Sequence, residues 1–140
     1  MIVLDTNVLS ELMRPQPSVR VMAWVAQQPT SELFTTSITE AEIFYGIESL
    51  AAGKRRKALL EAAEATFAED FAGRILAFDS DAARAFARLA ANSRALGRPR
   101  SQADMQIAAI AKARGARLAT HNAADFVDCN IDLVDPWTDS

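Results

Sequence analysis

Four acidic residues lie where a strand pattern ends or where a helix pattern carries an apolar face. They are Asp5, Glu42, Asp104 and Asp125. A carboxylate that leaves water is costly unless a partner neutralises its charge. Several carboxylates converging on one point provide the oxygen ligands that Mg²⁺ and Mn²⁺ prefer. The acids therefore predict a hard-cation site, provided that the fold brings them together.

Three of these acids also have an ordinary structural explanation. Asp5 follows an apolar run and could cap a helix. Asp104 lies three residues after Ser101, which is the spacing of a capping box. Asp125 and Asn122 follow a strand pattern and could form an Asx turn. Residue type alone therefore does not assign these acids to a site.

The apolar neighbours of Asp104 favour a functional role. Ile107, Ala108 and Ala111 share its face at helical spacing. A carboxylate that heads such a stripe is predicted to point toward the protein interior, where it needs a partner.

Glu42 and Glu40 compete for the same role on an earlier helix. Glu42 shares a face with Ile38 and Tyr45, whereas a capping box that opens at Ser37 explains Glu40. Periodicity leaves the choice open, because Glu40 also has the apolar neighbours Phe44 and Ile47.

The other polar residues narrow the chemistry. His121 is the only histidine and Cys129 the only cysteine, which argues against a zinc site built on those residue types. The sequence has no glycine-rich phosphate loop and no GxSxG elbow. Arg98 and Arg100 immediately precede the Asp104 helix and are predicted to hold a phosphate at the mouth of the site. The basic run 54–57 is expected to be a solvated helix start.

Composition bounds the class of protein. A length of 140 residues, half of them hydrophobic, predicts a single domain over residues 1–140 with a real core. The net charge of −3 argues against a uniformly basic nucleic-acid binder. A single cysteine fits a reducing compartment. No signal-peptide pattern and no apolar run of about 18 residues is present, so we expect a cytoplasmic protein without a membrane span.

Strand patterns alternate with helix patterns along the chain. The predicted strands are 2–4, 33–36, 75–78, 117–120 and 131–134. Between them, Ser18 is expected to cap a helix with an apolar stripe at Val19, Met22, Val25 and Ala26, and a long helix is expected from Asp79 to near Gly97.

This alternation predicts an α/β fold. We expect a three-layer sandwich with a central parallel sheet of four to five strands flanked by helices. Open parallel sheets bind ligands beyond the carboxyl ends of their strands, where the strand order reverses. Acids far apart in sequence can meet there.

The order of these motifs resembles a known family. The segments MIVLDTNVLSELMR, SITEAEIFYGIESL and RSQADMQIAAIAKARGARLATHNAADF are similar to the PIN domain, and more narrowly to the VapC-type toxins of bacterial toxin–antitoxin pairs. The segments FAGRILAFD and DPWTD resemble the FitB-like branch. The resemblance covers essentially the whole chain, with all blocks in order and at family-like spacing.

The resemblance implies a function. It implies a magnesium-dependent endoribonuclease, the toxin of a type II pair, that forms a homodimer and is inhibited by a cognate antitoxin, a small DNA-binding protein. The family's acids fall on Asp5, Glu42 and Asp104, which would hold Mg²⁺ or Mn²⁺, and its small polar residue matches Thr6. Relatives often carry a fourth acid; this chain has Asn122 at one common position, where it could donate a hydrogen bond instead, and Asp125 three residues on, and which of the two serves remains open.

The mechanism expected for such a site is hydrolysis of an RNA phosphodiester. The carboxylates would hold one or two Mg²⁺ ions that orient water for in-line attack. We expect the antitoxin to cover the acids with a basic side chain. The apolar residues Phe44, Tyr45 and Ile47 are weak support for a partner surface.

Two alternatives remain open. A phosphoaspartyl phosphatase needs a second Asp two residues after the first, where this chain has Asn7, and a receiver domain needs an acidic pair and a late lysine, neither of which is evident. A non-catalytic module that binds a partner or DNA would not need the acids.

Overall fold

The computed structural model describes residues 1–139 and shows five parallel strands in one sheet. The strands are β1 (Ile2–Leu4), β2 (Leu33–Thr36), β3 (Ile75–Leu76), β4 (Arg117–Ala119) and β5 (Leu133–Val134). Their order is β3-β2-β1-β4-β5. The predicted α/β class and three-layer arrangement are therefore confirmed.

Six α-helices and three short helical segments connect the strands. The helices are α1 (Thr6–Leu12), α2 (Val19–Ala26), α3 (Ser37–Glu48), α4 (Lys54–Ala65), α5 (Ser80–Ala95) and α6 (Gln102–Ala113). The shorter segments are η1 (Thr30–Glu32), the π-helical η2 (Thr66–Asp70) and η3 (Ala123–Cys129). No helix within residues 1–139 is both long and apolar enough to cross a membrane.

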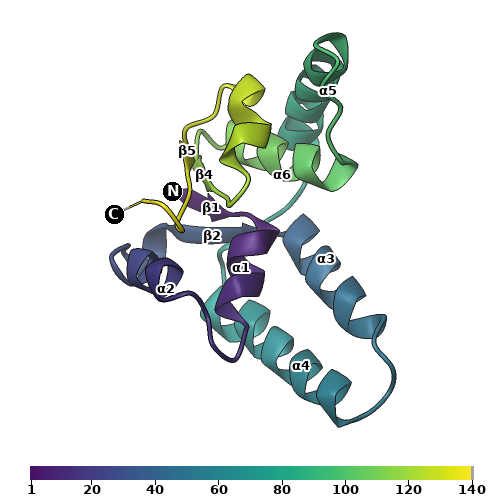
Figure 1. The fold of residues 1–140 in the computed structure, drawn as a ribbon. Helices are drawn as coiled ribbons and strands as arrows, with labels where there is room; N and C mark the ends of the chain where they lie inside the picture. Colours follow the sequence, from purple (N-terminus) through teal and green to yellow (C-terminus); the bar gives the residue numbers. More distant parts are fainter. Residues whose placement is uncertain (140) are drawn as a thin grey trace.

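The central strand divides the core into two halves. Leu4 packs in a cluster with residues of α1, α2, α3 and η2, whereas Val3 packs in a second cluster with residues of α5, α6 and η3. This alternation is the two-residue period of a strand that is buried on both faces. In Figure 1, α5 and α6 accordingly lie on the opposite side of β1 and β4 from α1, α2 and α4.

The strand order reverses beside β1. The chain runs outward from β1 to β2 and β3, and then returns to place β4 on the other side of β1. Leu4 pairs with Ala119 at the carboxyl end of these two strands. The residues that follow them, Asp5 and Thr120, therefore leave the sheet at the switch point where open α/β sheets bind ligands.

The predicted apolar stripe of α2 is wrong for Val19, Met22 and Ala26, which are exposed, whereas Val25 packs against the core. Val21 and Trp24 are the buried residues of this helix, while Val19 is 81% and Met22 49% exposed. The Trp24 indole N–H donates a hydrogen bond to the Asp139 carboxylate at 3.0 Å. The helix is rotated relative to the prediction because the largest side chain, with a polar atom to satisfy, occupies the interior.

Two other predicted features differ in detail. The cap of α3 is Thr36 rather than Ser37, because the Thr36 hydroxyl accepts the Thr39 backbone N–H at 3.0 Å. The capping box from Ser37 to Glu40 is therefore wrong. The predicted strands 75–78, 117–120 and 131–134 are shorter in the structure, because they end at Leu76, end at Ala119 and begin at Leu133. The predicted caps Ser18, Asp79 and Ser101 are confirmed.

Candidate active site

Asp5 occupies the switch point and is buried. It follows β1, is 3% exposed and caps α1 by accepting the Thr6 backbone N–H at 2.8 Å. The Thr120 hydroxyl, just after β4, donates to its other oxygen at 2.8 Å. The helix-cap explanation is thus correct for Asp5, but the cap engages only one of the two carboxylate oxygens.

Charge and burial together make this carboxylate unusual. The pKa of Asp5 is raised from 3.8 to about 6, chiefly by burial and to a smaller extent by the nearby Asp104 and Glu42 carboxylates, against the lowering effect of the hydrogen bonds from Thr120 and Thr6. Asp5 therefore lies within electrostatic reach of two of the other three predicted acids. The fold has brought together acids from the end of β1, the middle of α3 and the first turn of α6.

Glu42 joins this group through a hydroxyl. The Thr6 hydroxyl donates to the Glu42 carboxylate at 2.6 Å and lies 2.9 Å from the hydroxyl of the buried Thr39. Glu42 is exposed on α3, while its predicted neighbour Tyr45 points into solvent and is 76% exposed. The Thr6 hydroxyl thus orients the Glu42 carboxylate, and the helix face that Glu42 shares with Tyr45 contributes little to that orientation.

Asp104 reaches the site from the first turn of α6. The Ser101 hydroxyl accepts the Asp104 backbone N–H at 3.1 Å, so the capping contact uses the backbone and leaves the carboxylate available. Ile107, Ala108 and Ala111 are fully buried behind it, as their spacing predicted. The side chain itself is half-buried at the edge of the core.

Three polar residues that the sequence did not single out hold the site together by hydrogen bonds: Asn7, Thr39 and Thr120. Asn7 donates to the Thr120 hydroxyl at 3.3 Å and accepts the His121 backbone N–H at 3.2 Å, and thereby joins the ends of β1 and β4. Thr39 joins Thr6 to α3. Each of them directly follows a strand or belongs to the first turn of the next helix. That position in the sequence could have marked them as residues near the site.

The remaining predicted residues lie around this centre. Asn122 donates its backbone N–H to the Thr120 hydroxyl at 3.1 Å, whereas Asp125 is exposed on η3. Arg98 donates to both oxygens of Asp128 at 3.1 and 3.2 Å. Arg100 lies 3.9 Å from the same carboxylate and also donates to the Asp125 carbonyl. In this conformation both arginines bind protein groups.

The donor set fits a hard cation that keeps water ligands. Within residues 1–139, no three carboxylate, imidazole or thiol side chains are gathered tightly enough to hold an ion unaided. Mg²⁺ usually retains several waters and needs only one or two carboxylates, so an open cluster of carboxylates and hydroxyls suits it better than it suits a fully protein-ligated ion.

Comparison with known proteins identifies the fold family. The PIN domain family matches residues 2–129. The chain belongs to the PIN-domain family. It is 40% identical over 137 residues to the VapC ribonuclease Y4jK of Sinorhizobium fredii, with 98% of each chain covered. It is 37% identical over 139 residues to the toxin FitB of Neisseria gonorrhoeae, with 99% of this chain and 100% of FitB covered.

Solved structures agree with the sequence relatives. This PIN domain superposes on a chain of FitAB bound to an IR36 DNA fragment with a TM-score of 0.92 and 36% identity, covering 100% of this chain and 98% of that one. A chain of VapBC bound to DNA from Salmonella typhimurium gives a TM-score of 0.78 and 28% identity, with 96% and 97% covered. The resemblance noted in the sequence is confirmed.

Proposed function

We propose that this PIN domain is a magnesium-dependent endoribonuclease and the toxin of a toxin–antitoxin pair. The observation that carries the proposal is Asp5, a buried carboxylate at the strand switch point whose pKa is raised to about 6 with Glu42 and Asp104 as electrostatic neighbours. Such a group stays ionised at neutral pH more favourably when a cation is bound. The names of the relatives, a VapC ribonuclease and the toxin FitB, support the choice of chemistry and role.

Three carboxylates, together with retained waters, would hold the ion. Asp5 offers the lone pairs that its hydrogen bonds from Thr6 and Thr120 leave unused, Glu42 is aimed by the Thr6 hydroxyl, and Asp104 approaches from α6. Mn²⁺ would accept the same oxygen ligands. When bound, the ion supplies Lewis-acid chemistry that activates water for in-line attack and offsets charge at the scissile phosphate.

The protein groups perform the positioning. Thr120 and the Thr6 backbone N–H fix the orientation of Asp5, and Asn7 fixes Thr120. The Asn122 side chain is exposed next to this network, where it can donate a hydrogen bond to a phosphate oxygen. Asp125 is the alternative fourth acid and would have to act from η3. Arg98 and Arg100 would contact substrate only after leaving Asp128.

The proposed partner is a cognate antitoxin that is itself a small DNA-binding protein. The solved FitAB and VapBC structures are named as complexes bound to DNA fragments, which supports this class of partner. We further propose that the chain forms a homodimer. Of the three apolar residues that suggested a partner surface, Ile47 is buried and Phe44 packs on Phe67 at 5.6 Å, so only Tyr45 remains free to contribute.

Cleavage of RNA with and without divalent cation tests the proposal. Wild-type protein should cleave in Mg²⁺ or Mn²⁺ and stop when EDTA is in excess, because the donor set is built of oxygen atoms. Asp104→Asn should lose cleavage by at least about a hundredfold, the scale of losing an electrostatic catalytic group. Glu40→Gln, on the same helix as Glu42, is the matched control and should cleave normally. Strong cleavage in EDTA would refute the metal mechanism.

A further inference from the structure

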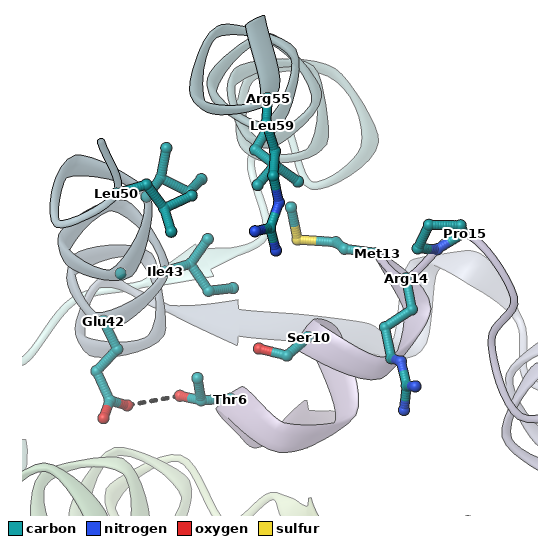
Figure 2. A pocket seen from close by; sticks show the side chains of 12 residues that line it. Thr6, Ser10, Met13, Arg14, Pro15, Glu42, Ile43, Leu50, Arg55 and Leu59 are labelled. Atoms are coloured by element: carbon teal, nitrogen blue, oxygen red, sulfur yellow. Dashed lines mark hydrogen bonds between the residues drawn. The ribbon is translucent and has the colours of Figure 1, made fainter. Parts of the chain in front are cut away.

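An open groove leads away from the acidic centre between α1, α3 and α4. Its volume is about 450 Å³, and Thr6 and Glu42 form one end of it. Figure 2 shows the aliphatic side chains of Ile43, Leu50 and Leu59 around its middle. The size falls within the range of ligand pockets. The groove is thus continuous with the proposed catalytic site, and nothing in the proposed chemistry uses it.

Cations face this groove on the side away from Glu42. Figure 2 shows the Arg55 guanidinium extending from α4 into the space between the helices. Arg14, in the turn after α1, lines the far end and its side chain is 66% exposed, with a 3.3 Å contact to Glu11. Exposed pairs of that kind contribute little, so Arg14 can exchange its partner readily.

The charge on Arg55 is not offset locally. It belongs to the run 54–57, four basic residues in the first turn of α4, a turn with no acidic residue. The first turn is the positive end of the helix dipole, where cations are unfavourable. Within the described part of the chain, Glu48 pairs with Arg56 at 2.6 Å, and no carboxylate is within ion-pair distance of Arg55. An anion in the groove would relieve this repulsion.

The other arginine pair is engaged elsewhere. Arg98 and Arg100 already share the Asp128 carboxylate. A polyanion that approaches three clustered carboxylates needs compensating cations nearby. Within residues 1–139, Arg55 is a cation without a carboxylate partner that lines a path to this centre.

We propose that the groove seats the stretch of single-stranded RNA next to the scissile phosphate, with the aliphatic middle under a base and Arg55 on a backbone phosphate. The inference rests on the proposed ribonuclease function. Base faces are apolar and bind such surfaces without sequence preference, while phosphate contacts give affinity and salt dependence. The groove therefore contributes affinity for the strand, and the acids perform the cleavage.

Two single-charge variants on the same turn of α4 test the phosphate contact. Arg55→Ala removes the groove cation, and Lys57→Ala removes an equal charge that does not line the groove but lies against Gly53 and Leu60. Cleavage of a 5′-labelled pool of random-sequence single-stranded RNA is measured with enzyme in excess, in Mg²⁺, at several salt concentrations. The half-saturating enzyme concentration and the maximal rate are read separately.

Arg55→Ala should raise the half-saturating concentration by about five- to tenfold and leave the maximal rate near that of wild type, because it acts in binding. The logarithmic salt slope should flatten by about 0.7, the value for one lost single-strand phosphate contact. Lys57→Ala should change each quantity by less than about twofold. Equal effects of the two variants would overturn the proposal, since they would indicate only a diffuse field.

A steric variant tests the groove itself. Gly46 lines it on α3, and a Cβ added there would meet nothing within 4 Å. Gly46→Met introduces a good helix former that projects into the groove, so the melting temperature should hold while RNA binding weakens by about tenfold or more. Ala62→Met, on an exposed position of α4, is the matched control.

The remaining outcomes are also decisive. A Gly46→Met protein that cleaves like wild type would overturn the RNA path. If Gly46→Met and Arg55→Ala spare cleavage but weaken inhibition by a protein partner, the groove is a polypeptide docking site and the proposal is wrong. If wild-type protein neither binds nor cleaves RNA in Mg²⁺, the ribonuclease function itself has failed, and the groove assignment fails with it.

Discussion

At the scale of single residues, the acids are the main evidence for a functional site. Their sequence positions correctly suggested convergence, since Asp5 shares its electrostatic environment with Glu42 and Asp104. The sequence could not show which atoms remain free, because that depends on whether each cap uses a backbone or a side-chain oxygen. Asp104 is capped through its N–H, and Asp5 through one carboxylate oxygen.

Asp104→Asn should raise the melting temperature of the metal-free protein and shrink the stabilisation by Mg²⁺. The first effect follows because carboxylates without a cation destabilise one another in the folded state. The second follows because a ligand stabilises through its affinity for the native state. Each effect should be on the order of 1 kcal/mol, since the site is partly solvated. Melting curves of both proteins in EDTA and in millimolar Mg²⁺ measure them, and an equal Mg²⁺ shift would remove Asp104 from the ligand set.

Asp5 should make the metal-free protein less stable as pH rises from about 4 to about 6. Its folded pKa of about 6 exceeds the usual value of 3.8 for an aspartate, so between these values the native state binds more protons than the unfolded state. Stability must then fall with rising pH, and the full cost, about 3 kcal/mol, is present above the folded pKa.

Asp5→Asn tests this assignment because it removes the titration. In EDTA, the variant should be more stable than wild type at pH 7 and lose that advantage near pH 4. Urea unfolding at the two pH values gives both free energies. A wild-type stability that rises from pH 4 to pH 7 in parallel with the variant would contradict the raised pKa of Asp5.

At the scale of elements, the sequence predicted which helices and strands exist better than it predicted which face of each is buried. Strand β1 and helix α6 were predictable because burial on both faces or on one face leaves an unambiguous pattern. Helix α2 was not, because Val19, Met22 and Trp24 offer two apolar faces and only tertiary packing selects between them. The groove beside the acids was equally invisible, since it arises from how α1, α3 and α4 diverge.

Two glycines should respond oppositely to the same substitution. Gly115 ends α6 with a φ of 63°, a left-handed conformation, and places β4 beside β1. Gly115→Ala should therefore destabilise by about 1 kcal/mol. Gly46 lies inside α3 with no atom within 4 Å of an added Cβ, so Gly46→Ala should stabilise by about 0.5–1 kcal/mol. Denaturant midpoints of the two variants measure both changes in stability. A shift of the same sign in both would show that the position of the glycine relative to its helix does not determine the effect.

At the scale of the whole molecule, the proposed catalytic centre would also be a point of control. The cluster is open to solvent through the exposed Glu42 and the groove beside it. An arginine from a bound protein could offer the carboxylates the positive charge that they otherwise take from Mg²⁺. Inhibition and metal binding would then be linked through the same side chains, so that each ligand weakens the other by an equal factor.

The proposed homodimer is tested separately from the chemistry of the site. Light scattering of the isolated chain should give twice the mass of 15.2 kDa at micromolar concentration. A chain that remains monomeric across that range would remove the dimer from the proposed function without touching the chemistry of the acids.

The antitoxin's affinity should therefore fall as Mg²⁺ rises. For wild-type protein, titration of the cognate partner by calorimetry should show weaker binding in millimolar Mg²⁺ than in NaCl of matched ionic strength, which controls for general screening. Asp104→Asn should flatten this dependence, because a site that binds the ion weakly has little to lose on competition. Replacing the basic residue that we expect the partner to insert with alanine should also flatten the Mg²⁺ dependence of the affinity. If Mg²⁺ leaves the affinity unchanged while the partner still inhibits cleavage, the partner blocks the RNA path without engaging the carboxylates. The proposal that the partner's basic side chain and Mg²⁺ compete for the same carboxylates would then be wrong.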